Sequence, residues 1–324
     1  MEKRTEMIKG ARKILHECTN VKKGENVLII IDTNMPLSIA ETLAMVCKER
    51  EAEPTIIIMN PVPIDGNDPP PPVAEAMQKA QVILLGSRGI FHSPSRIRAT
   101  SAGARILVIV GFTEEDMFRG PIEVNFLEFK EFIKKVTDVV RRAKEARITT
   151  TAGTDIYFDL KGRLEKVVTQ TGIYHEPGDW GTLTLEVAIS PPIGKAQGVV
   201  VCDASATLLR TGLIKEPVRL TVKDGRVTEI SGGTEAKTIA DLLAAMGDPM
   251  VYNVAELGIG LNPKATMTGS HKDKGVFGTC HIGIGSNLTW GGDIKAATHC
   301  DLIMYAPKIE LDGKVVLENY KFNL

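Results

Sequence analysis

The sequence predicts an α/β domain with a parallel sheet, followed by a mostly antiparallel β (α+β) domain that carries a metal site. Before residue 147, apolar runs alternate with helix-length segments, which is the pattern of parallel strands in βαβ units. After it, short alternating strands and Asp-Gly turns dominate. We therefore predict one domain over residues 1–147 and a second over residues 148–324.

The first half contains runs that are apolar on both faces, as expected for buried parallel strands. These runs are Asn26 to Ile31, Thr55 to Met59, Gln81 to Leu85 and Arg105 to Val110. Pro36 and the run Pro69 to Pro72 precede helical segments, where proline is tolerated in the first turn. A long helix begins near Phe126 and ends in the charged run Arg141 to Arg147, which we interpret as a solvated helix face and the connector between domains.

The second half carries hairpin signals. Asp224-Gly225 and Asp312-Gly313 each separate two strand-like arms, and we expect one inserted helix around Thr238 to Met246. The stretches Gly258-Ile-Gly260 and Gly283-Ile-Gly285 lack the third glycine of a dinucleotide-binding loop. We interpret them as tight turns that let the backbone approach a metal site.

Composition limits the class of protein. The formal net charge of -1 comes from 39 basic and 40 acidic residues, which predicts no nucleic-acid or anionic membrane partner. No apolar run is long enough to span a bilayer and the N-terminus does not resemble a signal peptide, so we expect a cytoplasmic protein. The five cysteines are scattered without a C-x-x-C pair, which is typical of a reducing compartment. We expect Cys280 and Cys300 to be small core residues that face away from the candidate ligands beside them.

His299 and Asp301 are the strongest candidates for metal ligands. Residues two apart on a strand share a face, so an imidazole nitrogen and a carboxylate oxygen there can bind one ion. Upstream, His281, Glu256 and Glu186 lie in strand-like or Gly-rich stretches.

The two glutamates lie in apolar surroundings, where an unpaired carboxylate is costly to bury. No nearby Arg or Lys offers Glu256 a partner, so a shared metal centre explains these residues better than separate coincidences. Five ligands exceed the usual three of a single catalytic zinc. They predict either a bridged pair of ions or one ion with additional carboxylates around it.

In order and context, Glu186, Glu256, His281 and the His299-x-Asp301 pair resemble the ligand set of the M29 family of metalloaminopeptidases of the aminopeptidase T type. The resemblance implies a two-metal centre of Zn, Co or Mn with a bridging carboxylate, in which Glu186 or a nearby carboxylate accepts a proton from an activated water. The aminopeptidases carry a catalytic tyrosine seven residues after the histidine that matches His281. This chain has Leu288 there.

The same superfamily is similar to the mononuclear iron(II) 2,5-dihydroxypyridine 5,6-dioxygenases. By this resemblance His299 and Asp301 match two members of a His, His, Asp triad, and the third is either His281 or Glu256. It also implies that His92 and His175, in Pro-containing loops, contact the substrate.

Three functions are therefore open. A metal-dependent hydrolase acting on an amide or short peptide is the main expectation, because five ligands suit two ions. An iron(II) ring-cleaving dioxygenase acting on a small molecule is the alternative. A catalytically inactive metal-binding or dimer-forming module is the third. We further expect a homo-oligomer.

Overall fold

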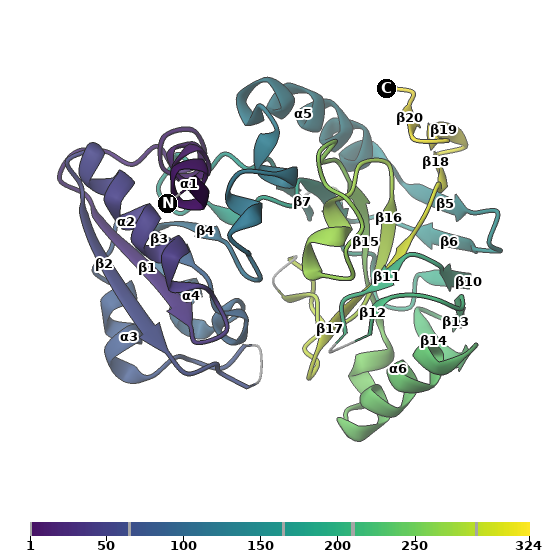
Figure 1. The fold of residues 1–324 in the computed structure, drawn as a ribbon. Helices are drawn as coiled ribbons and strands as arrows, with labels where there is room; N and C mark the ends of the chain where they lie inside the picture. Colours follow the sequence, from purple (N-terminus) through teal and green to yellow (C-terminus); the bar gives the residue numbers. More distant parts are fainter. Residues whose placement is uncertain (1, 64–65, 164–165, 209–210, 289–290) are drawn as a thin grey trace. The chain divides into compact units, whose positions relative to one another are not determined.

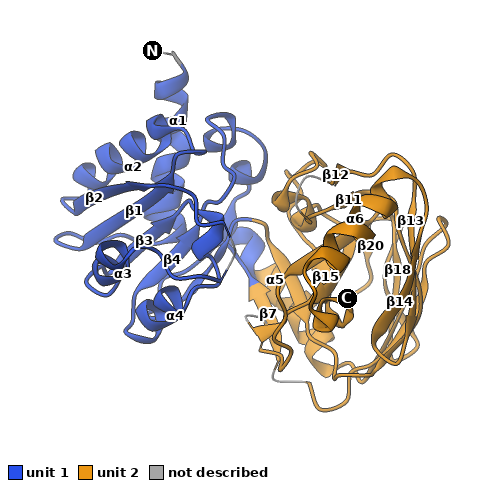
Figure 2. Cartoon of the chain, turned by 90° about the horizontal axis from the view of Figure 1, so that it is seen from below, with its two compact units in different colours: residues 1–130, 170–183 blue, residues 131–169, 184–324 orange. Residues whose placement is uncertain are grey.

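The computed structural model describes residues 2–63, 66–163, 166–208, 211–288 and 291–324. The chain forms two compact units (Figure 2). Unit 1 comprises residues 1–130 and 170–183, and unit 2 comprises residues 131–169 and 184–324. A single domain boundary after residue 147 stays a prediction.

A parallel sheet forms the centre of unit 1, with the strand order β2-β1-β3-β4-β8 (Figure 1). Its strands are β1 (Asn26–Asp32), β2 (Glu53–Met59), β3 (Val82–Leu85), β4 (Arg105–Val108) and β8 (Trp180–Thr182). All neighbouring pairs are parallel. The four strands predicted in the first half are thereby confirmed, and the fifth is added by the segment that returns to unit 1.

Helices cover both faces of this sheet, with α1 and α2 on one side and α3 and α4 on the other (Figure 2). The helical elements of unit 1 are α1 (Glu2–Arg12), the π-helix η1 (Lys13–Cys18), α2 (Leu37–Glu49), α3 (Pro71–Met77), η2 (Arg88–Ile90), α4 (Pro94–Ser101), η3 (Glu115–Met117) and η4 (Gly120–Glu123). Pro36 and Pro70 lie at the N-caps of α2 and α3, which confirms the predicted helix starts. Apolar residues from β1, β3 and β4 pack with α3 and α4 in one buried core.

The charged run after the long helix is not all helical. Helix α5 (Phe126–Arg142) begins in unit 1 and continues in unit 2, but it ends at Arg142. Residues Glu145–Thr149 form strand β5, which pairs with β6 and β18. The prediction that the run through Arg147 is a helix face was wrong there, because strand pairing and burial of Ala146 and Ile148 outweigh the local helical pattern.

Unit 2 contains two antiparallel sheets, which confirms the predicted fold class. One has the order β14-β13-β10-β6-β5-β18-β19-β20 and the other the order β12-β11-β17-β16-β15-β9-β7. The remaining strands of the first sheet are β6 (Asp155–Asp159), β10 (Ala196–Cys202), β13 (Val218–Lys223), β14 (Arg226–Ser231), β18 (Lys308–Leu311), β19 (Lys314–Glu318) and β20 (Lys321–Phe322). The second sheet consists of β7 (Val167–Gln170), β9 (Glu186–Ile189), β11 (Ser205–Ala206), β12 (Gly212–Leu213), β15 (Val254–Gly260), β16 (Cys280–Gly285) and β17 (His299–Met304).

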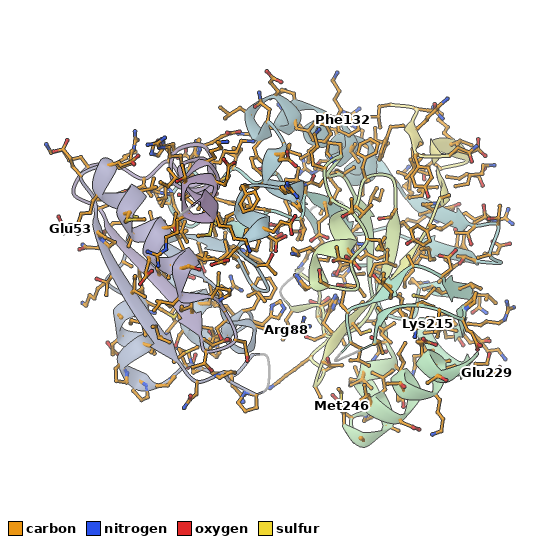
Figure 3. The ribbon with its side chains drawn as sticks, in the orientation of Figure 1. Glu53, Arg88, Phe132, Lys215, Glu229 and Met246 are labelled. Atoms are coloured by element: carbon orange, nitrogen blue, oxygen red, sulfur yellow. The ribbon has the colours of Figure 1, made fainter. Side chains whose placement is uncertain are left out.

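Both predicted hairpins are confirmed, since β13 pairs with β14 across Asp224-Gly225 and β18 pairs with β19 across Asp312-Gly313. The inserted helix is α6 (Thr234–Ala245), and short 3₁₀ turns η5 (Pro249–Tyr252) and η6 (His271–Gly275) flank β15. Phe132, labelled in Figure 3, lies on α5 with its ring centroid 5.2 Å from that of Phe322 on β20.

The five cysteines are buried and form no disulfide with one another, and Cys280 and Cys300 are among them. This confirms that these two are core residues. Among the described residues, no helix is both long enough and apolar enough to cross a membrane.

Candidate metal centre

The five candidate ligands come from four neighbouring strands of the second sheet of unit 2. Glu186 begins β9, Glu256 lies in β15, His281 in β16, and His299 and Asp301 in β17. These strands are hydrogen-bonded in the order β17-β16-β15-β9. The alternation of side chains along each strand directs these residues to one face of the sheet.

Each candidate ligand has a glycine as a strand partner. The pairs are Glu186 with Gly260, Glu256 with Gly283, His281 with Gly258, His299 with Gly285, and Asp301 with Gly283. A Cβ on Gly258 would lie 2.0 Å from His281 Nε2, so no larger residue fits there without moving the imidazole. The Gly-rich stretches were predicted to be turns, which was wrong, because they are strand residues. Because these glycines have no side chain, they leave space for the ligand side chains.

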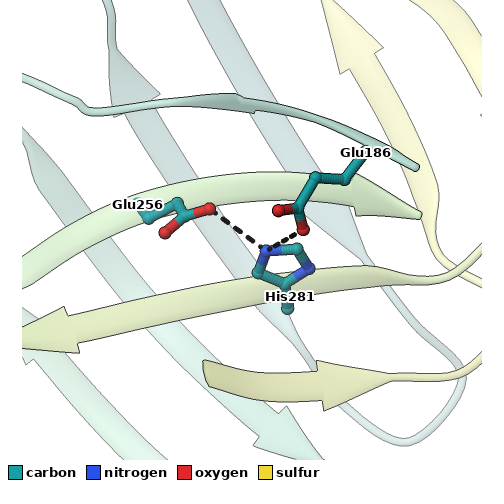
Figure 4. Close-up of side chains that lie close together, drawn as sticks. All are labelled: Glu186, Glu256 and His281. Atoms are coloured by element: carbon teal, nitrogen blue, oxygen red, sulfur yellow. Dashed lines mark hydrogen bonds and ion pairs between the residues drawn. The ribbon is translucent and has the colours of Figure 1, made fainter. Parts of the chain in front are cut away.

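Glu186, Glu256 and His281 form a first group, in which all three side chains are fully buried (Figure 4). His281 Nε2 lies 3.3 Å from Glu256 Oε1, to which it is hydrogen-bonded, and 3.7 Å from Glu186 Oε2. His281 Nδ1 is buried and has no hydrogen-bond partner among the described residues. In this group the Nε2 atom of the histidine is therefore already used in a hydrogen bond with Glu256.

Glu256, His299 and Asp301 form a second group that shares Glu256 with the first. His299 Nε2 lies 2.8 Å from Asp301 Oδ1 and 3.1 Å from Glu256 Oε2. On the other side of the ring, His299 Nδ1 lies 2.7 Å from the carbonyl oxygen of Ser286. A carbonyl oxygen only accepts, so Nδ1 carries the hydrogen and donates it, and Nε2 faces two carboxylates.

Thr207 orients Asp301 and was missed in the sequence. Its Oγ1 accepts a hydrogen bond from the Asp301 backbone N–H at 2.8 Å and lies 3.4 Å from Asp301 Oδ2. The Thr207 N–H also donates to the Asp301 carbonyl at 3.0 Å. Thr207 follows β11, which pairs with β17, and no motif in the sequence signals this pairing.

Lys274 was also missed. Its Nζ lies 2.8 Å from Glu186 Oε1, and its side chain is 1% exposed. Burial lowers the pKa of Lys274, but Glu186 outweighs that effect and the pKa is raised, so the side chain stays an ammonium. Burial raises the pKa of Glu186, against the opposing effect of Lys274. Burial of a carboxylate was the only signal that a cation was needed here.

The side chains of the second group shift one another's pKa values. Burial favours the neutral form of Glu256, but its hydrogen bond with His281 and its contact with His299 lower its pKa to about 2. Burial lowers the pKa of His299, yet Asp301 raises it well above the usual value, and the ionised His299 holds the pKa of Asp301 well below its usual range against the effect of burial. The carboxylates also raise the pKa of His281, despite its burial.

These residues fit a divalent metal ion. Glu256 Oε2 is buried and lies 3.1 Å from His299 Nε2 without forming a hydrogen bond to any described residue. Without an ion, only a proton on His299 Nε2 relieves the repulsion between the imidazole lone pair and the facing carboxylates. A cation bound there would satisfy all three side chains, and such nitrogen and oxygen donors bind zinc, manganese or iron.

The other predicted site residues lie outside this cluster. His92 and His175 belong to unit 1, so their predicted substrate contacts with a metal site stay predictions. The His92 ring packs on Phe91 with centroids 4.2 Å apart, and His175 Nε2 lies 2.7 Å from the Glu17 carbonyl oxygen. Leu288, at the position of the peptidase tyrosine, is 52% exposed.

Tyr174 does not replace the tyrosine of the aminopeptidases, because it is buried within unit 1. Its hydroxyl lies 2.8 Å from Gln170 Oε1 and 2.6 Å from the Thr182 carbonyl oxygen. Both contacts are acceptors, so the single hydroxyl hydrogen is already in use.

Comparison with known proteins gives a consistent result. The sequence matches the family of NicX, 2,5-dihydroxypyridine 5,6-dioxygenase, over residues 6–323. A curated relative, the 2,5-dihydroxypyridine 5,6-dioxygenase of Pseudomonas putida KT2440, is 27% identical over 256 residues, which cover 75% of this chain and 71% of that protein.

Two solved structures share the fold. The 2,5-dihydroxypyridine dioxygenase from Pseudomonas putida KT2440 matches with a TM-score of 0.86 and 20% identity, covering 99% of this chain and 97% of that one. Wild-type AmpT from Thermus thermophilus matches with a TM-score of 0.66 and 16% identity, covering 99% of each chain. Among the three functions open from the sequence, the comparisons favour the dioxygenase alternative over the hydrolase. The chain therefore belongs to the NicX family of 2,5-dihydroxypyridine 5,6-dioxygenases.

Proposed function

We propose that this protein is an iron(II)-dependent dioxygenase that cleaves the ring of a small dihydroxylated heteroaromatic compound. The observation that carries the proposal is the group Glu256, His299 and Asp301, in a chain that matches the dioxygenase family over nearly its whole length. One imidazole and two carboxylates would hold the ion. This donor set resembles the facial triad of non-haem iron oxygenases, with Glu256 in place of one histidine.

A bound iron(II) would supply open positions for O2 and for a dihydroxy-aromatic compound, whose ring would supply the electrons that reduce O2. The protein holds the donors in place. The Ser286 carbonyl fixes the His299 ring through its Nδ1–H, and Thr207 fixes the Asp301 carboxylate. These contacts keep His299 Nε2 directed at the two carboxylates, which is how outer contacts usually tune a metal ligand.

Glu186 is our candidate for the group that takes a proton from the substrate hydroxyl. Burial raises its pKa, although Lys274 opposes this, and a raised pKa makes a carboxylate a stronger base. Its Oε2 has no hydrogen-bond partner among the described residues. We retain His92 and His175 as proposed substrate contacts.

The hydrolase remains the second candidate because Glu186, Glu256 and His281 form a second group with the donor types of a metal site. Two features make it weaker. Leu288 offers no hydroxyl to stabilise an oxyanion, and loss of one such donor typically costs on the order of a hundredfold or more in turnover. Lys274 also places a positive charge in that group.

The experiment loads metal-free protein with iron(II) without oxygen and then follows O2 uptake and loss of ring absorbance with a panel of dihydroxypyridines. In parallel, zinc-, cobalt- and manganese-loaded protein is offered aminoacyl-arylamides. The proposal expects O2 uptake coupled to ring loss in the iron-loaded protein and little amide cleavage with any metal.

Asp301→Asn is the diagnostic variant, since it keeps the shape of the side chain and removes its charge. It is expected to lose iron and activity together. Asp155→Asn is the matched control, because Asp155 is an exposed carboxylate on β6 paired with Arg147. If the iron-loaded protein takes up no O2 with any dihydroxypyridine while a zinc, cobalt or manganese form cleaves amides, the dioxygenase proposal is wrong.

A further inference from the structure

The first group, formed by Glu186, Glu256 and His281, contains a cation of the protein's own. Lys274 Nζ lies 2.8 Å from Glu186 Oε1, and both side chains are buried from solvent. An ammonium at this distance already compensates the Glu186 carboxylate that a second metal ion would need as a ligand.

The chain around Lys274 is built to deliver this side chain. Asp273 is fully buried, and its carboxylate accepts hydrogen bonds from the backbone N–H groups of Thr268 and Gly269 and from the Thr268 hydroxyl. Gly275 lies so close to the start of β9 that a Cβ there would be 1.7 Å from the Thr184 carbonyl oxygen. These contacts fix η6 against the strand that carries Glu186.

The two histidines differ in their hydrogen bonds, and this difference distinguishes the two groups. His299 has the support expected of a ligand, because its Nδ1–H is donated to the Ser286 carbonyl and its Nε2 faces the carboxylates. His281 uses Nε2 in its hydrogen bond with Glu256 Oε1, and its buried Nδ1 has no partner among the described residues. His281 therefore acts as a positioning residue for Glu256.

Charge balance leads to the same result. Glu186, Glu256 and Asp301 together carry three negative charges when ionised. One divalent ion and the Lys274 ammonium match them, with neutral histidines. A second divalent ion would leave two uncompensated positive charges in a buried cluster, which is strongly unfavourable.

We propose that Lys274 takes the place of a second metal ion, so that the centre holds a single divalent ion between Glu256, His299 and Asp301. The proposal rests on the proposed function for the identity of that ion, but not for the number of ions bound. Removing the ammonium should open the first group to a second ion, because Glu186 would then lack a compensating cation.

The test is metal counting by mass spectrometry on protein that has been stripped of metal, reloaded with iron(II) or manganese(II) and freed of excess ion. The wild type is expected to bind about one ion per chain, and Lys274→Met about two. Lys272→Met, in the same turn, is the matched control and should keep one. Two ions in the wild type, or one ion in folded Lys274→Met, would overturn the proposal.

A second pair of measurements applies if Lys274→Met does not fold without metal. The double variant Glu186→Gln with Lys274→Met removes both members of the ion pair, so it should fold and bind one ion. For the single variant, added manganese(II) should raise the thermal unfolding temperature by more than it does for the wild type. No such excess stabilisation contradicts the proposal.

The proposed number of ions and the proposed reaction can be rejected independently of each other. One ion per chain without O2 uptake would leave the role of Lys274 intact and reject the dioxygenase. Ring cleavage by wild-type protein that holds two ions would support the dioxygenase and reject the role of Lys274.

Discussion

Gly283 on β16 lies so close to His299 on β17 that a Cβ at position 283 would be 2.8 Å from the Cε1 atom of the imidazole. The same Cβ would lie 2.8 Å from the Cβ of Glu256. Both neighbours are candidate ligands, so the glycine leaves the space that lets strands β15, β16 and β17 bring them together. A substitution at Gly283 therefore tests directly whether His299 and Glu256 bind the metal ion.

Gly283→Ala is expected to lower metal affinity by on the order of tenfold or more, because the methyl group must displace His299 or Glu256. Competition with a chromophoric chelator measures the change. Ile284→Val is the control, since Ile284 is the next residue on the strand and points to the opposite face. It should cost about 1 kcal/mol in the free energy of unfolding and leave metal affinity unchanged. Equal affinities for both variants would show that the glycine does not matter.

Thr207→Val removes the hydroxyl that orients Asp301. Metal affinity should fall by on the order of ten- to a hundredfold, as is usual when a contact that supports a ligand is lost. Thr154→Val is the comparison, because it loses a buried hydroxyl that bonds to Val201 in the other sheet. That variant should lose about 1 kcal/mol of folding stability and keep its metal. Normal metal affinity in Thr207→Val would contradict the assigned role of Thr207.

Metal affinity should fall as the pH is lowered. The pKa of His299 is raised well above its usual value in the metal-free protein, chiefly by Asp301 and against the effect of burial, so the imidazole carries a proton that a metal ion must displace. Below that raised pKa, each unit of pH should cost up to about a tenfold loss of affinity. Chelator competition between pH about 6 and about 8.5 checks this. A flat profile would mean that His299 binds no metal.

His92→Ala and His175→Ala should both raise KM or lower turnover without changing the iron content, as expected for substrate contacts. His175→Ala also loses the contact with the Glu17 carbonyl and should in addition reduce the free energy of unfolding by about 1 kcal/mol. Steady-state kinetics and metal analysis measure the first effect, and chemical denaturation measures the second. Unchanged kinetics in His92→Ala would remove it from the proposed substrate contacts.

Local patterns in the sequence were sufficient for much of the fold. The apolar runs of β1 to β4 and the Asp-Gly hairpins follow from periodicity and turn chemistry, which act over a few residues. The segment from Glu145 was mistaken for helix, because its strand character depends on pairing with β18, which lies far along the chain. The same limit applies to β8, whose place in the parallel sheet of unit 1 depends on β4.

The metal centre could be predicted only in part. His299 and Asp301 share a strand, so their common face is visible in the sequence. Lys274, Ser286 and Thr207 reach the ligands through tertiary contacts that no spacing encodes. The glycines could be noticed in the sequence, but their role as strand partners of the ligands depends on the register of β15 and β16.

The most direct test is an iron titration of the metal-free protein, in which O2 uptake with a dihydroxypyridine substrate is followed as iron(II) is added without excess. Since one group of three ligands would hold the catalytic ion, turnover should rise linearly and level off at about one iron per chain. One O2 should be consumed for each ring cleaved. A plateau at about two irons per chain, or no O2 uptake at any iron content, would contradict a mononuclear dioxygenase.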